Sequence, residues 1–175
     1  MNIVNWHEFI KSIKQAGFAR HDYISSDNNL LYAYIFFLIG REDIKMDLYD
    51  LKKLIAKWFF MCSITGRYTG SPETAMESDL ARLRGIETPD QFKKVLDEII
   101  DGQLTNDFWS LTLPMDLSTS SSTSPSLYAY YAAQYIIGAN GLFSKLKISD
   151  LLQEGLRSKK SALERHHLFP KAWLE

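Results

Sequence analysis

Two adjacent histidines, His166 and His167, lie in the stretch ERHHLFPKAWLE near the end of the 175-residue sequence. Imidazole accepts a proton near neutral pH and is also a common metal ligand. Hydrolysis of a phosphodiester needs both functions close together, because a metal ion polarises the phosphate while a base activates the attacking water. Neighbouring residues on a strand point to opposite faces, so one histidine can face a metal ion while the other faces the water.

Three other sequence features invite a functional interpretation, and each has a simpler structural one. His7 and His21 have no partner at metal-ligand spacing, so we expect ordinary surface or core-edge side chains. The glycines of TGRYTGS flank Arg67 without the lysine and preceding strand of a P-loop, so we expect Arg67 at a corner between helices, bonding helix-end carbonyls. The tyrosines of YAYYAAQY could stack on bases, but their helical spacing favours a core position.

Charge is unevenly distributed along the chain, although the net charge is only −1. Residues 1–144 hold 13 Lys+Arg and 17 Asp+Glu, whereas residues 145–175 hold 7 and 4, so the basic end is also the histidine end. We expect any contacts with phosphates to come from this end, although a solvated lysine-rich tail gives the same pattern. The basic residues are Lys145, Lys147, Arg157, Lys159, Lys160, Arg165 and Lys171.

Composition predicts a cytoplasmic protein with a substantial core. Apolar residues make up 46% and aromatic residues 13% of the chain, which excludes a disordered protein. The single cysteine, Cys62, excludes an intramolecular disulfide framework and suits a reducing compartment. No secretory signal is visible at the start. The apolar run 30–39 is about half the ~20 residues of a membrane span, so we expect a fully buried helix and no membrane partner.

Helical periodicity recurs along the chain and predicts an all-α, multi-helix bundle. Apolar stripes cover residues 6–16, 51–62, 76–83, 92–100 and 128–136, and a short helix capped by Ser149 is expected through residue 156. Ser71-Pro72 and the capping box from Thr88 to Gln91 mark two further helix starts. The predicted core contains Trp6, Phe9, Ile13, Leu51, Trp58, Leu80, Phe92, Leu96, Ile99, Tyr131 and Tyr135.

Two stretches carry a resemblance to a known family. ERHHLFPKAWL (164–174) resembles the opening motif of HNH nucleases, in the version that closes modification-dependent restriction proteins of the GmrSD type. A second stretch, residues 51–83, is similar to a helical segment of these proteins, and it reads LKKLIAKWFFMCSITGRYTGSPETAMESDLARL. In the family segment, GRYSGSSET is followed by DLxRL, where x is any residue. The apolar run 30–38 also lies where the family has a similar helix, so the resemblance spans roughly residues 30–174.

The resemblance implies a longer parent protein with three parts. These are a ParB-like nucleotide-hydrolysing domain, which nothing here resembles, a helical region, and an HNH domain with one Mg²⁺ or Mn²⁺ ion. It makes His166 a metal ligand and His167 the general base, and it requires further motif residues downstream. The implied partners are DNA and the remaining nuclease and NTPase domains. The predicted DNA-contacting residues are Lys159, Lys160, Arg165 and Lys171.

The predicted domain organisation follows from this resemblance. Residues 1–157 form a helical domain with an exposed Ser-rich loop at 118–126. Residues 158–175 form a linker and the start of a truncated HNH motif, with at most the first strand of its ββα-metal fold. The chain is then an inactive helical segment of a restriction-type endonuclease. The alternatives are a non-enzymatic helical module that binds protein or DNA, and a small hydrolase that uses Glu164 with the two histidines.

Overall fold

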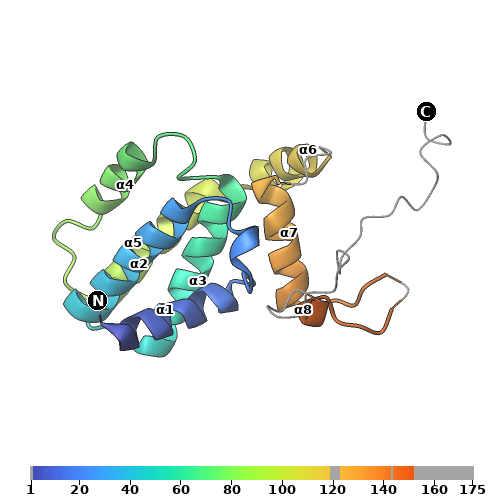
Figure 1. The fold of residues 1–175 in the computed structure, drawn as a ribbon. Coiled ribbons are helices and arrows are strands. Elements are labelled where there is room, and N and C mark those ends of the chain that lie inside the picture. The colour runs from blue at the N-terminus through green and yellow to red at the C-terminus, as the bar shows by residue number, and fades with distance from the viewer. Residues whose placement is uncertain (1, 119–122, 143, 152–175) are drawn as a thin grey trace.

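The regular elements of the chain are helices. A computed structural model describes residues 2–118, 123–142 and 144–151 (Figure 1), and within these ranges the only extended pairing is an isolated bridge between Asn140 and Lys147. The predicted all-α, multi-helix class is confirmed, whereas the strand expected near the histidine pair lies outside the described residues.

The α-helices are α1 (Ile3–Gln15), α2 (Asp27–Leu38), α3 (Leu48–Thr65), α4 (Pro72–Ala81), α5 (Pro89–Gln103), α6 (Leu113–Leu117), α7 (Pro125–Ile136) and α8 (Ile148–Leu151). A 3₁₀-helix, η1, covers His21–Tyr23, and two π-helices, η2 and η3, cover Ile39–Asp43 and Phe108–Thr112.

Side-chain caps fix several helix starts. The Thr88 hydroxyl accepts a hydrogen bond from the Gln91 backbone N–H at 3.3 Å, and the Gln91 side chain accepts one from the Thr88 N–H at 3.3 Å. The capping box predicted for α5 is therefore confirmed. Asp47 caps α3 in a related way, accepting from the Tyr49 N–H at 2.8 Å. Gly66 ends α3 in the left-handed conformation that glycine adopts without strain.

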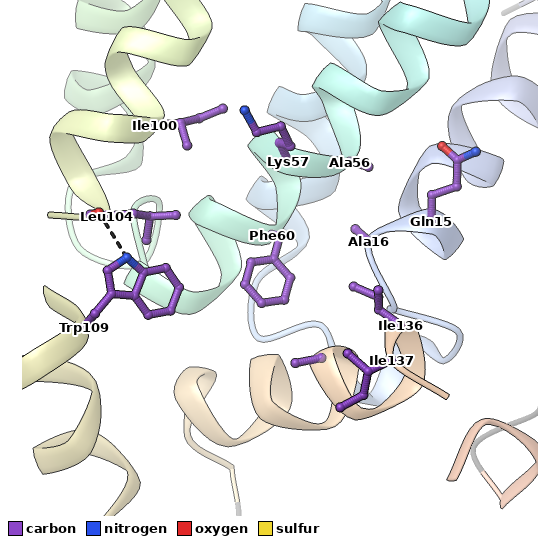
Figure 2. A pocket seen from close by; sticks show the side chains of 11 residues that line it. Gln15, Ala16, Ala56, Lys57, Phe60, Ile100, Leu104, Trp109, Ile136 and Ile137 are labelled. Carbon is purple, nitrogen blue, oxygen red and sulfur yellow. Dashed lines mark hydrogen bonds between the residues drawn. The ribbon is translucent and has the colours of Figure 1, made fainter. Parts of the chain in front are cut away.

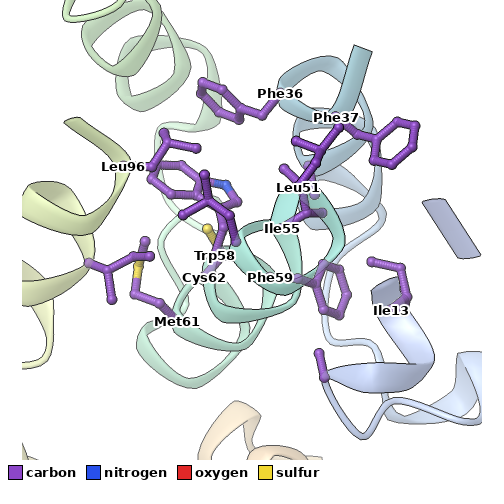
Figure 3. Close-up of a cluster of buried hydrophobic side chains, with 14 of the residues drawn as sticks. Ile13, Phe36, Phe37, Leu51, Ile55, Trp58, Phe59, Met61, Cys62 and Leu96 are labelled. Atoms are coloured by element: carbon purple, nitrogen blue, oxygen red, sulfur yellow. The ribbon is translucent and has the colours of Figure 1, made fainter. Parts of the chain in front are cut away.

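Helix α3 is the central element of the bundle, and it packs against α1, α2, α5 and α7 (Figure 1). Its buried residues point to several sides, because other helices pack on several of its faces, while Lys53 and Lys57 remain exposed. Figure 3 shows Trp58 beside Leu96 of α5 and Phe36 of α2, while Phe59 points toward Ile13 of α1. Leu51 and Trp58 are fully buried, which confirms the predicted core stripe of this helix, and Phe59, which was not predicted, is fully buried as well.

Aromatic side chains pack the interface between the first three helices. The Phe36 and Trp58 ring centroids lie 4.7 Å apart, and those of Phe18 and Phe59 lie 5.0 Å apart with the rings edge to face. Such offset and edge-to-face pairs add to the free energy gained from burying apolar area. Phe9, Ile13, Phe92, Leu96 and Ile99 of the predicted core are also buried, whereas Trp6 is half-buried.

Helix α7 approaches the bundle through small residues. Its buried residues are Ser126, Ala129 and Ala132, and a Cβ atom added to Gly17 would lie 2.3 Å from the Ala132 carbonyl oxygen. Tyr131 and Tyr135, which the sequence placed in the core, are only half-buried. That prediction was wrong because close contact between the two backbones leaves room for methyl groups and hydroxyls, and the rings lie at the edge of the contact.

Three further boundaries and core positions differ from the sequence analysis. Leu80 is 36% exposed, because α4 turns Met76 and Asp79 inward instead. Leu31 is 54% exposed, so α2 buries one face and is not the fully buried helix predicted. The Ser-rich loop predicted at 118–126 is shorter, because α7 begins at Pro125 and Ser126 is buried. Among the described residues, no helix is both long and apolar enough to cross a membrane.

Candidate functional site

The predicted nuclease residues lie outside the described residues. These are the metal ligand His166, the general base His167 and the basic residues Arg157, Lys159, Lys160, Arg165 and Lys171. Of the basic end, Lys145 and Lys147 are described, and both are exposed in the connection between α7 and α8. The positions of the two histidines relative to the basic residues therefore remain a prediction.

The two other histidines are exposed. His7 lies on α1, and His21 Nε2 lies 3.1 Å from Asp27 Oδ1 on a part of the surface where both side chains are mostly exposed. Within the described ranges, no group of three or more His, Cys, Asp or Glu side chains could hold a metal ion.

The described part of the chain does contain one buried polar cluster, formed by Arg67, Tyr68 and Asp79. Arg67 Nε and Nη2 donate to the two carboxylate oxygens of Asp79 at 2.9 and 2.5 Å. The Tyr68 hydroxyl donates to Asp79 Oδ2 at 2.6 Å. Asp79 is 1% exposed, and the Tyr68 ring packs edge to face on Tyr32 with centroids 4.7 Å apart. We call this set the Arg67–Tyr68–Asp79 cluster.

The turn between α3 and α4 positions this cluster. Left-handed Gly66 redirects the chain, and the Arg67 backbone N–H donates to the Cys62 carbonyl at 3.1 Å, which keeps Arg67 at the end of α3. Asp79 comes from the other side, on the face of α4 that also buries Met76. Few other residues of α4 are buried, and Figure 1 shows this helix at the periphery of the bundle. The cluster is therefore a main attachment of α4.

The prediction that the Arg67 side chain bonds helix-end carbonyls is wrong, because its guanidinium pairs with the Asp79 carboxylate. The burial of Asp79 was not predicted from the sequence. The available signal was the i, i+3 spacing from Met76, which places Asp79 on the same helix face. Arg67, Tyr68 and Asp79 all fall within the GRYTG and DL residues that carry the family resemblance.

The cluster is suited to holding elements together and not to proton transfer with a substrate. Burial by itself lowers the pKa of the Arg67 guanidinium, but the hydrogen bonds and charge of Asp79 raise it overall, so Arg67 stays cationic. Burial raises the pKa of the Tyr68 hydroxyl, which keeps the phenol neutral as a hydrogen-bond donor. A bidentate arginine–carboxylate pair is strong and directional, and it fixes the angle between the two elements that supply it.

The Cys62 thiol lies close to this cluster, and its raised pKa leads us to expect a loss of stability at alkaline pH. Burial raises the pKa of its thiol well above the usual value of about 8.5. The unfolded chain therefore releases this proton at lower pH than the folded chain. The stabilisation that comes from this difference in thiol pKa is complete below about pH 8.5. The free energy of unfolding then declines as the pH rises further, by at most about 1.4 kcal/mol per pH unit.

Urea titrations at pH 8, 9 and 10 test this expectation against a Cys62→Ala variant. The variant starts from a lower free energy of unfolding, because it loses buried atoms, but its stability should decline less between pH 9 and 10. If both proteins show the same decline, the thiol is not the group responsible.

A second feature of the described residues is an apolar groove with a volume of about 380 Å³ (Figure 2). Its floor is Ala56 and Phe60 of α3, on the side of the central helix between α5 and α7. One wall is the end of α5 together with Trp109 of η3, whose indole N–H donates to the Leu104 carbonyl at 3.1 Å. The other wall is formed by the ends of α1 and α7, and it includes Ala16, Ala133, Ile136 and Ile137.

Polar side chains contribute little to this groove. Gln15 and Lys57 are the polar residues that line it, and Lys57 Nζ donates to Asp97 Oδ1 at 2.8 Å. Burial by itself raises the pKa of the Asp97 carboxyl, but hydrogen bonds from Lys57 and Lys93 lower it overall. The groove thus has an apolar interior and one neutralised ion pair at its edge. This lining is suited to apolar groups.

Comparisons with protein-family models, with curated proteins and with solved structures found no match for this chain.

Proposed function

We propose that the chain is the helical segment of a bacterial restriction-type DNA endonuclease, whose complete protein hydrolyses DNA phosphodiesters with a divalent metal ion and a histidine base. The resemblance of residues 51–83 and 164–174 carries this proposal. The Arg67–Tyr68–Asp79 cluster is consistent with it, because Arg67 and Tyr68 of the first stretch both donate hydrogen bonds to Asp79 of the same stretch. These residues of the motif thus have a structural role in this fold.

His166 by itself does not make a metal site, and the described part of the chain adds no ligand group to it. Mg²⁺ and Mn²⁺ prefer oxygen ligands at near-octahedral geometry, and a single histidine does not hold such an ion. His166 is the one ligand that we assign, and the described residues provide no ligand cluster. In the proposal, the remaining ligands come from the parent chain. His167 takes the proton from the attacking water.

DNA and the other domains of the parent protein are the proposed partners. The basic residues Lys159, Lys160, Arg165 and Lys171 would contact phosphates, since such contacts dominate the affinity of proteins for DNA. The single cysteine and the DNA substrate both suit a cytoplasmic location.

DNA cleavage by two proteins tests the proposal. The 175-residue chain and the complete protein encoded by the same gene would be incubated with supercoiled DNA and Mg²⁺ or Mn²⁺. We expect cleavage by the complete protein, on DNA that carries the appropriate modification, and none by the 175-residue chain. Metal-dependent nicking by the shorter chain would contradict the assignment. So would a coding sequence without an asparagine and a further histidine or asparagine within a few dozen codons after Glu175.

The apolar groove favours a second candidate function, a helical module that binds another protein. An open apolar groove of this kind is typical of sites that take an amphipathic helix or an extended apolar segment. In this alternative the histidine pair has no catalytic role. A stop codon directly after Glu175 would favour it over the nuclease.

A further inference from the structure

The groove between α5 and α7 is lined by large apolar side chains that remain exposed. Ile137 is 70% exposed, Ile136 is 53% exposed and Trp109 is 45% exposed, and all three line it. Figure 2 shows the Phe60 ring on the floor between Trp109 and Ile137. Contiguous exposed apolar residues around a concave surface mark a place where another segment binds, because covering them releases water.

We propose that this groove is covered by the chain's own segment 152–175, with large apolar side chains of LFPKAWL (168–174) seated between α5 and α7. The path of the chain is the first argument. Left-handed Gly138 ends α7, the bridge between Asn140 and Lys147 reverses the chain, and α8 packs back against α7. Residue 152 therefore follows an element that contacts the helix whose end forms one wall of the groove.

The length of the segment is the second argument. Residues 152–168 can span up to roughly 50 Å when extended. A domain of this size has a radius of gyration of about 16 Å. The stretch 168–174 can therefore reach the groove from the end of α8 without any change in the described helices.

The chemistry of the segment is the third argument. Its apolar side chains include Leu168, Phe169, Trp173 and Leu174, which match an apolar groove. Its charged residues are Arg157, Lys159, Lys160, Arg165 and Lys171 against Glu154, Glu164 and Glu175, so it is basic. Asp101 and Asp107 are exposed and lie close in sequence to the lining residues Ile100, Leu104 and Trp109, so the segment that forms this wall of the groove carries acidic side chains. Opposite charges at the rim favour this orientation and suppress others.

The inference goes beyond the proposed function and does not depend on it. It places the histidine pair next to the helical domain whether or not His167 is a catalytic base. Its test therefore needs neither DNA nor a metal ion, and a failure of one proposal leaves the other intact.

Hydrogen exchange of the full 175-residue chain tests the docking. We expect amides of residues 163–174 to exchange at least about tenfold more slowly than in an unfolded peptide of the same sequence. An Ile137→Asp variant should lose this protection, because it places a carboxylate on the wall of the groove. Leu142→Asp is the matched control, since Leu142 is 69% exposed against 70% for Ile137 and does not line the groove. It should retain the protection.

Disulfide trapping gives a second readout that does not depend on a disruptive substitution. An Ile137→Cys/Phe169→Cys chain should form an intrachain disulfide at least about tenfold faster than a Leu142→Cys/Phe169→Cys chain, because docking raises the effective concentration of the first pair. The native Cys62 is fully buried and does not compete. Exchange at the unfolded rate, equal behaviour of the matched variants, or protection that appears only as the chain dimerises would each overturn the proposal.

Discussion

Replacing His167 by alanine in the complete protein should abolish detectable DNA cleavage and leave the affinity for DNA nearly unchanged. A general base acts on the proton that moves in the transition state, so its removal lowers the rate without weakening ground-state binding. The expected loss in single-turnover rate is about 10²–10⁴-fold. Cleavage with saturating enzyme and a separate binding titration with intact DNA would measure the two effects.

The neighbouring histidine provides the comparison. His166→Ala should lose affinity for the metal ion as well as rate, so raising the metal concentration should partly restore its activity but not that of His167→Ala. His7→Ala is a neutral control, because His7 is exposed on α1 and far along the chain from the motif. An active complete protein carrying His167→Ala would refute the proposed role of this residue.

Replacing Asp79 by alanine should lower the free energy of unfolding by about 3–5 kcal/mol. The substitution leaves the Arg67 guanidinium half-buried without its counter-ion, and it leaves the buried Tyr68 hydroxyl without an acceptor. An unpaired buried charge is far less stable than the same charge in water. Urea or guanidinium titration of the variant and the parent chain would measure the difference.

The exposed pair between Arg82 and Glu98 is the matched control. These side chains are 45% and 49% exposed, so Glu98→Ala should change stability by less than about 1 kcal/mol. A double variant, Arg67→Met/Asp79→Leu, should be more stable than Asp79→Ala, because it removes both charges at once. Equal stabilities of Asp79→Ala and Glu98→Ala would show that the cluster does not hold α4 in place.

Helix starts and the central stripe were predictable because they depend on local interactions. Thr88 and Gln91 form their capping box within one turn, and the α3 stripe from Leu51 to Trp58 follows from helical period alone. Helix α7 was predicted less well. Periodicity identified its tyrosine-rich face, but the face that packs is set by how closely Ala132 approaches Gly17, and this distance depends on residues far apart in sequence.

The candidate sites show the same division. The pairing of Arg67 with Asp79 crosses a turn between two helices, so a sequence pattern could indicate the motif but not the partners. The groove is built from the ends of α1, α5 and α7 and from η3. No sequence pattern predicted η3. The histidine pair is the opposite case. Its chemistry could be predicted from the sequence alone, whereas its position lies outside the described residues.

The complete burial of Cys62 makes this thiol a reporter of unfolding. Alkylating reagents need an exposed thiolate, and here both the access and the ionisation are suppressed until the contacts around α3 separate. The rate at which the native chain is modified should therefore track the rare openings of its core and remain insensitive to motions of the surface. Because the chain has no other cysteine, cysteines introduced on the surface can be labelled selectively, and native protein can be sorted from misfolded protein by its resistance to alkylation.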